Sequence, residues 1–300
     1  MNHKRSLSLF LTHNPENRSK TMQKRTPPSL GKAASDQEAH LDRTGPVSLM
    51  DLRKLKRPGI IAHRGYRAKY PENTLTAFRA ALDAGVDMIE LDVLLSKDRK
   101  MVVIHDPALE RTTNGKGPVG ERTVAELKEL DAGSWFDPQF AGERVPTLED
   151  VLDLVDGQVP VNIEIKRAAY EPEAPPDAIE KQVVDLVRRK RMTNLVLISS
   201  FEWRVLQNVS ESEDAPATAL LSRYPDEDNH LEVCRKLRAF SWHPSFLEVK
   251  REHVAEMHEA GIMVFPYNAD TREDVQRMLD LEVDGVITSD PLLLQGYGRP

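Results

Sequence analysis

The 300-residue sequence has a single cysteine, Cys234, so no disulfide can form within the chain and a reducing compartment suits it. It also lacks any apolar run long enough to span a bilayer. Excess positive charge is confined to residues 1–57, which carry 12 Lys or Arg against 5 Asp or Glu; the rest therefore sums to −14 out of a total of −7. Because nucleic-acid affinity comes mostly from cations that neutralise phosphates, this acidic body excludes general nucleic-acid binding.

The first 50 residues have little of the periodicity that a packed core needs. They are rich in Ser, Thr, Pro, Asn, Gln and Lys, which predicts a disordered or loosely attached basic leader before a folded domain at 51–300. The stretch SLSLFLT follows Lys4 and Arg5 as in a signal peptide, but it is short and lacks a small-residue cleavage site. We therefore expect a cytoplasmic protein.

From residue 59 onward, short apolar runs alternate with helical patterns. NTLTAFRAALDAG is typical of an amphipathic helix, with Asn73 as its N-cap and Gly85 after its end. Nine runs have the length of strands: GIIA, MIELDV, MVVIH, VNIEIK, LVLISS, ATALL, AFSW, IMVFP and DGVIT. This alternation predicts an α/β protein.

One of the nine runs cannot be a parallel neighbour of the run before it. Only SKDRK separates MIELDVLL from MVVIH, which is too short for a crossover and predicts an antiparallel hairpin. The other eight runs predict a TIM (β/α)8 barrel, whose active site lies at the C-terminal ends of its strands. A doubly wound open sheet is the structural alternative.

Carboxylates gather on two of the expected strands. Glu90 and Asp92 are two residues apart in MIELDV and so share one strand face, as do Glu164 and Lys166 in VNIEIK. Three carboxylates that face the barrel interior together repel one another unless a cation neutralises them, which suits Mg²⁺ or Ca²⁺ rather than Zn²⁺. The alternative is that these residues form ion pairs on solvated strand ends.

The expected hairpin also places a histidine. With its turn near Asp98 and Arg99, His105 falls roughly opposite Asp92 and within reach of the expected metal site. His63 is a second histidine, because it directly follows the GIIA run. Two imidazoles beside a cation-bound oxyanion can serve as acid and base near neutral pH.

Basic side chains complete the expected site. Arg64 follows His63 directly, and together with Lys166 it could hold a phosphate. We therefore expect His63 and Arg64 to face a phosphate ester beside a metal ion.

Several spaced motifs give the chain a family resemblance. They are HRG at 63–65, PENT at 71–74, IELDV at 89–93, HDPALERTTNGKG at 105–117, VPTLEDVL at 145–152, EIK at 164–166 and DGVITSDP at 284–291. In these motifs the chain closely resembles the glycerophosphodiester phosphodiesterase family across residues 59–292.

The resemblance implies a TIM barrel with a small insertion at about residues 106–146. It implies a small-molecule substrate, a glycerophosphodiester, that is hydrolysed to glycerol 3-phosphate and an alcohol with one divalent cation. For this substrate we expect the glycerol 2-hydroxyl to attack phosphorus and give a cyclic phosphate, which water then opens. By position, the residues that match the family's site are the metal ligands Glu90, Asp92 and Glu164, the acid/base pair His63 and His105, and the phosphate contacts Arg64 and Lys166.

One departure from the family pattern concerns the substrate. Where many members carry Trp-Thr-Val-Asn on the last-but-one strand, this chain has PYNAD, so Tyr267 is a candidate substrate wall. Two other activities stay open. A lysophospholipase D-like or cyclising phospholipase would need an apolar groove, for which Trp135, Phe136 and Phe140 are candidates. A noncatalytic phosphodiester-binding module would not need all seven site residues.

Overall fold

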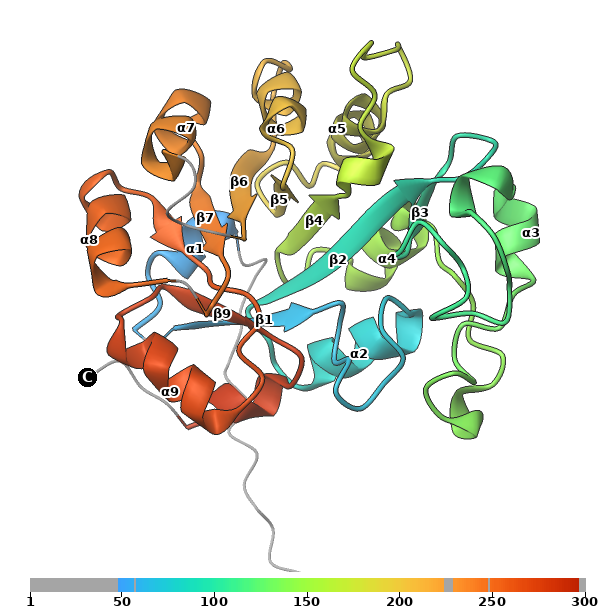
Figure 1. The fold of residues 1–300 in the computed structure, drawn as a ribbon, viewed down its shortest axis with the longest axis horizontal. Helices are drawn as coiled ribbons and strands as arrows, with labels where there is room; N and C mark the ends of the chain where they lie inside the picture. Colours follow the sequence, from blue (N-terminus) through green and yellow to red (C-terminus); the bar gives the residue numbers. More distant parts are fainter. Residues whose placement is uncertain (1–47, 57, 224–228, 248, 297–300) are drawn as a thin grey trace, which may run out of the picture. The chain divides into compact units, whose positions relative to one another are not determined.

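The computed structural model of the chain describes residues 48–56, 58–223, 229–247 and 249–296. Within these residues, nine strands form one sheet, with eight in the order β8-β7-β6-β5-β4-β2-β1-β9 and β3 paired to β2 (Figure 1). Their bounds are β1 Gly59–His63, β2 Met88–Leu95, β3 Met101–Val103, β4 Val161–Ile165, β5 Val196–Ser200, β6 Ala217–Ser222, β7 Ser241–Pro244, β8 Met263–Val264 and β9 Gly285–Thr288. Each overlaps a strand expected from the sequence.

The eight strands other than β3 form a nearly closed parallel barrel. Each neighbouring pair along the order is parallel. The two ends of the order meet through a parallel bridge between Tyr267 and Ile287, and the Ile287 N–H donates to the Pro266 carbonyl at 3.0 Å. The predicted TIM barrel is confirmed, and the open-sheet alternative is wrong.

Helices surround the strands in Figure 1. The α-helices are α1 Leu49–Leu52, α2 Leu75–Asp83, α3 Val124–Lys128, α4 Leu148–Val155, α5 Ile179–Arg189, α6 Trp203–Ser210, α7 His230–Leu237, α8 Arg251–Glu259 and α9 Arg272–Asp280. The alternation along β2 explains the packing, because Ile89 and Leu91 belong to the large core shared with the helices, whereas Met88 belongs to a separate core inside the barrel. Among the described residues, no helix is both long and apolar enough to cross a membrane.

Helix α2 is confirmed, but its N-cap differs from the expected residue. Thr74 caps the helix, since its side chain accepts from the Ala77 N–H at 3.2 Å. Asn73 instead has a positive φ of 57°, which asparagine tolerates better than most residues. Its side-chain amide is thereby free to donate to Asp92 in the barrel, at 2.9 Å.

The antiparallel hairpin of β2 and β3 is confirmed, with Val93 opposite Val103 and Leu95 opposite Met101. This register continues one step further, because the Ile104 N–H donates to the Asp92 carbonyl at 3.1 Å. The residue opposite Asp92 is therefore Ile104 and not His105, so the expected pairing is off by one residue. His105 follows directly, at the point where the chain leaves the sheet.

Residues 106–146, the expected insertion, lie between β3 and α4. They contain α3 and the 3₁₀ turns η1 (Val119–Glu121) and η2 (Pro138–Phe140). The aromatic rings of this segment pack on one another: the centroids of Phe136 and Phe140 are 5.8 Å apart, and Phe140 lies 5.6 Å from Tyr70. These rings therefore belong to a small core of the insertion.

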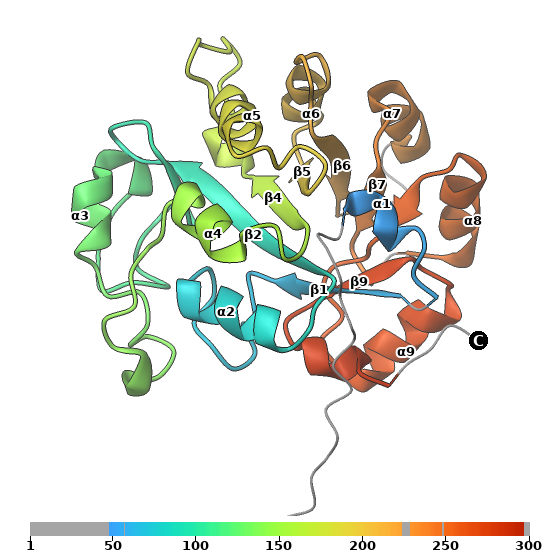
Figure 2. The ribbon, with the colours of Figure 1, turned by 180° about the vertical axis from the view of Figure 1, so that it is seen from behind.

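Helix α1 packs against one end of the barrel. Ser48 caps it, and the Ser48 N–H and hydroxyl both donate to Asp51. Leu49 and Leu52 are buried in the inner barrel core with Ile61 of β1, Met88 of β2 and Phe265, which directly follows β8. Figure 2 shows the barrel from the side on which α1 lies. The expected leader boundary at residue 50 falls inside this helix. The rest of the expected leader, residues 1–47, lies outside the described residues.

A testable consequence concerns this end of the barrel. Leu52 is 2% exposed, so Leu52→Ala should destabilise the protein by about 2–5 kcal/mol, the range for removing a buried leucine side chain. Met50 lies on the same helix and is 57% exposed, so Met50→Ala is the matched control and should change little. Denaturant unfolding measures both. Equal stabilities for the two variants would contradict the packing of α1.

Candidate active site

The expected site residues meet at the C-terminal ends of three adjacent strands. His63 ends β1 and lies in register with Glu90 of β2, and Asp92 lies in register with Glu164 of β4. Lys166 directly follows β4 and Arg64 directly follows β1. Parallel strands thus bring together residues that are up to about a hundred positions apart in the chain.

Three carboxylates form the centre of the site. Ligand oxygens of Glu90, Asp92 and Glu164 all lie within 4.8 Å of one another, and all three residues are buried. Burial and the neighbouring carboxylates raise the pKa of Glu90 well above its usual value and that of Glu164 to about 7. This arrangement suits a cation.

Two basic side chains offset part of this charge. Lys166 Nζ lies 2.5 Å from Glu164 Oε1 and 3.1 Å from Asp92 Oδ1, and Arg64 Nε lies 3.2 Å from Asp92 Oδ2. Although burial raises the pKa of Asp92, these two cations lower it below its ordinary value. With all three carboxylates ionised, as a bound cation would hold them, the two basic side chains leave one negative charge, and only oxygen atoms are offered as ligands. The residues therefore fit a hard divalent cation.

The HRG motif makes a tight turn that fixes Arg64. Arg64 and Gly65 both have positive φ values, 56° and 79°. A Cβ on Gly65 would lie 2.7 Å from the backbone carbon of Ala77 in α2, so only glycine fits there. The Arg64 N–H donates to Glu90 at 2.8 Å, and a non-glycine residue held at positive φ is a strained feature typical of functional sites.

The two histidines have different surroundings. His63 is 7% exposed, its Nε2 lies 3.9 Å from Glu90 Oε2, and its Nδ1 has no hydrogen-bond partner among the described residues. Burial, with Arg64 and Arg67 nearby, lowers its pKa well below the usual value, so the ring is neutral. His105 is more exposed, and its Nδ1 lies 2.5 Å from Asp106 Oδ1.

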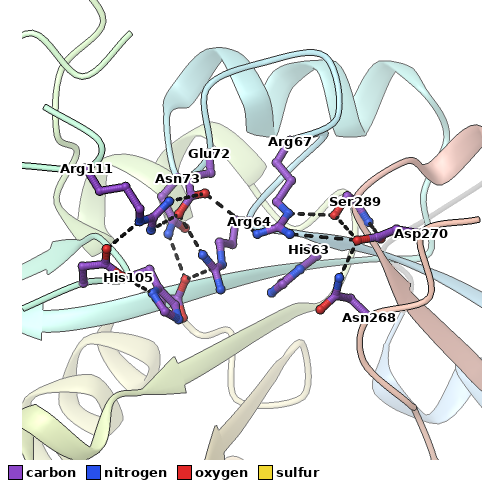
Figure 3. Close-up of polar contacts among 12 residues, drawn as sticks. His63, Arg64, Arg67, Glu72, Asn73, His105, Arg111, Asn268, Asp270 and Ser289 are labelled. Carbon is purple, nitrogen blue, oxygen red and sulfur yellow. Dashed lines mark hydrogen bonds and ion pairs between the residues drawn. The ribbon is translucent and has the colours of Figure 1, made fainter. Parts of the chain in front are cut away.

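Further polar residues connect these groups, as Figure 3 shows. Glu72 Oε1 accepts from Arg64 Nη1 at 2.8 Å, and Arg111 of the insertion binds both Glu72 and Asp106. The sequence analysis assigned no role to Glu72, Asp106 or Arg111. They lie in PENT and HDPALER, and an acidic residue directly after a candidate catalytic histidine was a signal that could have identified Asp106.

A second polar group lies on the other side of His63 in Figure 3. Asp270 accepts from the Ser289 N–H at 2.7 Å, and Arg67 Nε donates to the Ser289 hydroxyl at 2.7 Å. Tyr267, the candidate substrate wall, is half-buried and donates its hydroxyl to the Ser222 carbonyl at 3.0 Å. Its ring packs edge-on against Phe201.

Comparison with known proteins identifies the family. The sequence model of the glycerophosphoryl diester phosphodiesterase family matches residues 63–293. A glycerophosphodiester phosphodiesterase of Caldanaerobacter subterraneus is 40% identical over 235 residues, which cover 77% of this chain and 94% of the relative. One of Bacillus subtilis is 35% identical over 77% of this chain and 83% of its own length.

Solved structures agree with this result. The glycerophosphodiester phosphodiesterase of Agrobacterium tumefaciens has a TM-score of 0.69 and 31% identity, over 80% of this chain and 100% of its own. An Oleispira antarctica phosphodiesterase, solved with the product sn-glycerol-3-phosphate, has a TM-score of 0.73 and 27% identity, over 80% of this chain and 96% of its own. The matched residues, the barrel and the convergent site together show that this chain belongs to the glycerophosphoryl diester phosphodiesterase family of enzymes.

Proposed function

We propose that this protein hydrolyses glycerophosphodiesters to glycerol 3-phosphate and an alcohol with the help of one divalent cation, in the cytoplasm as the sequence favours. The observation that carries the proposal is the buried group of three carboxylates beside two cations and two histidines at one end of the barrel. An anionic diester fits there only when the net negative charge of the carboxylates is offset. Glu90, Asp92 and Glu164 would hold the cation, which would neutralise charge on the non-bridging phosphate oxygens.

The chain's own residues would divide the remaining work. Arg64 and Lys166 are already held by Asp92, and from there they can donate to the phosphate oxygens. His63 is neutral and its Nδ1 has no partner among the described residues, so it suits the base. Burial lowers the pKa of His105, but the Asp106 carboxylate beside it opposes this by stabilising an imidazolium, which suits the acid.

We propose two steps with these roles. In the first, His63 takes the proton of the glycerol 2-hydroxyl while that oxygen attacks phosphorus, the bond to the departing alcohol breaks, and His105 gives its proton to the alcohol oxygen. The product is a cyclic phosphate. In the second, His105 takes a proton from water as the water attacks phosphorus. The ring bond to the 2-oxygen breaks, and His63 returns the proton to give glycerol 3-phosphate.

The cation requirement can be tested directly. Chelation should abolish release of glycerol 3-phosphate, and Glu164→Gln should weaken cation binding at least about tenfold because a charged oxygen ligand becomes neutral. Glu149→Gln, which changes a side chain on α4 that is 63% exposed, is the matched control and should bind the cation normally. Calorimetric titration and a product assay measure both effects. Full turnover in chelator would refute the cation site, and substrate binding without turnover would favour the noncatalytic module.

The cyclising route makes a separate prediction. A substrate whose 2-hydroxyl is methylated keeps the phosphate contacts but lacks the internal nucleophile, so its hydrolysis should be at least about a hundredfold slower. Its affinity as a competitive inhibitor of the parent substrate is the control for binding. Hydrolysis near the rate of the parent would show direct attack by water, and the metal ligands would keep their assignment.

A second candidate substrate class is favoured by a groove along the β2–β3 hairpin. Its volume is about 470 Å³, and its lining includes the end of β2 and residues of the β2–β3 turn. The residues that line it are Leu94, Leu95, Ser96, Lys97, Arg99, Pro107, Pro118, Val119, Gly120, Ala168, Ala169 and Glu171. The groove combines apolar side chains with Lys97, Arg99 and Glu171, and it includes Pro107 and Ala168, each two residues from a site residue. We propose that it accepts an apolar departing alcohol. The insertion aromatics expected for this purpose pack on one another instead.

The length of the alkyl chain in the departing alcohol tests the proposed role of this groove. For glycerophosphoalkanols from ethanol to octanol, kcat/KM should rise about two- to fourfold per methylene, the gain expected for burying a methylene group. Gly120→Trp should remove this dependence by filling the groove, because a Cβ at Gly120 meets only ordinary contacts. Ala141→Trp is the matched control, since Ala141 is an exposed residue of the insertion that does not line the groove. A flat series for the unmodified protein would contradict the groove's role.

A further inference from the structure

The insertion contributes two side chains that lie behind His105: Asp106 contacts it directly, and Arg111 reaches it through Asp106. The proposed acid/base chemistry uses only the charge of Asp106. Asp106 directly follows His105, and its Oδ1 lies 2.5 Å from His105 Nδ1. Arg111 Nε donates to the other oxygen of Asp106 at 2.5 Å. Both oxygens of Asp106 are therefore engaged, one by the imidazole and one by the guanidinium.

The geometry determines which nitrogen of His105 carries the proton. The contact with Arg111 lowers the pKa of Asp106 to about 2, so this carboxylate is ionised and can only accept hydrogen bonds. His105 Nδ1 must therefore donate, which leaves Nε2 to exchange a proton with the substrate. A fixed tautomer of this kind depends on the partner of the other ring nitrogen.

Arg111 is itself held from the barrel side. Its Nη1 and Nη2 donate to the two oxygens of Glu72 at 3.0 and 2.8 Å. Glu72 is buried and also accepts from Arg64 Nη1 at 2.8 Å, so the same carboxylate orients the guanidinium of a proposed phosphate contact. One continuous set of hydrogen bonds thus runs from His105 to Arg64 through Asp106, Arg111 and Glu72.

We propose that Asp106 and Arg111 are positioning residues for His105: Asp106 fixes the ring with Nε2 toward the phosphate, and Arg111 fixes Asp106 against the barrel. This inference rests on the proposed role of His105 as the acid that protonates the departing alcohol. It gives the insertion a part in the reaction, because Arg111 joins the insertion to Glu72 in the loop after β1. If Asp106 and Arg111 only connected the two loops, their replacement would not act through His105.

Substrates with different departing groups distinguish a positioning role of Asp106 from a purely structural one. Asp106→Asn should lower kcat for glycerophosphocholine at least about tenfold with little change in KM, because choline needs a proton as it departs. The loss should shrink to under about threefold for a p-nitrophenyl ester of glycerol phosphate, since p-nitrophenolate departs without a proton. Arg111→Gln, at a largely exposed side chain, should show the same pattern with a smaller loss.

A double-variant cycle provides the second measurement. In a His105→Ala background, adding Asp106→Asn should cost less than about twofold, because the residue through which Asp106 acts is already absent. The matched control is Arg144→Ala, which removes an exposed arginine of the same insertion that donates to the Glu129 carbonyl. It should leave both substrates unaffected. Thermal unfolding of each variant checks that the barrel is intact.

The results that overturn the inference are distinct from those that overturn the proposed function. Equal losses for the choline and p-nitrophenyl substrates, a full Asp106→Asn loss in the His105→Ala background, or no loss from Asp106→Asn would each refute the positioning role. Full activity of His105→Ala would refute the assignment of His105 itself, and the inference would fail with it. If Asp106→Asn does not fold, Arg111→Gln carries the same test.

Discussion

The burial of three carboxylates within 4.8 Å of one another is the constraint on which the rest of this site depends. Such a group is unstable without positive charge, and the protein brings Arg64 and Lys166 to it from the ends of two strands that flank β2. The strained turn at Arg64 and Gly65 follows from this requirement, because it directs the Arg64 N–H and the guanidinium toward Glu90 and Asp92. With all three carboxylates ionised, one negative charge would remain, and a divalent cation would offset it.

The insertion is joined to this centre by ion pairs and not only by packing. Its aromatic residues form a small core that reaches Tyr70, while Arg111 binds Glu72 beside the carboxylates. The same segment carries Asp106 against His105 and contributes Pro118 and Val119 to the groove along the hairpin. The proposed acid and the proposed path of the departing alcohol therefore depend on one segment, whereas the base, His63, depends on the barrel alone.

The sequence predicted the barrel and the convergence of the site because both follow from strand periodicity. Parity along β2 and β4 placed Glu90, Asp92, Glu164 and Lys166 on one face, and the short SKDRK connection identified the hairpin. The sequence-based prediction was wrong where the outcome depends on local contacts. The N-cap of α2 is Thr74, because Asn73 takes a positive φ and donates to Asp92. In the hairpin, Ile104 and not His105 lies opposite Asp92, which is a difference of one residue in register. The roles of Glu72 and Arg111 could not be predicted, since they depend on how a loop and the insertion meet in space.

The central claim is that the three carboxylates bind one divalent cation beside the two basic side chains. A crystal structure of the protein soaked with Mn²⁺, with data collected at an anomalous wavelength, tests this most directly. The account predicts one strong anomalous peak in contact with an oxygen of each of Glu90, Asp92 and Glu164, with Arg64 and Lys166 still beside Asp92. No peak between these carboxylates, or a peak bound elsewhere on the barrel, would contradict it.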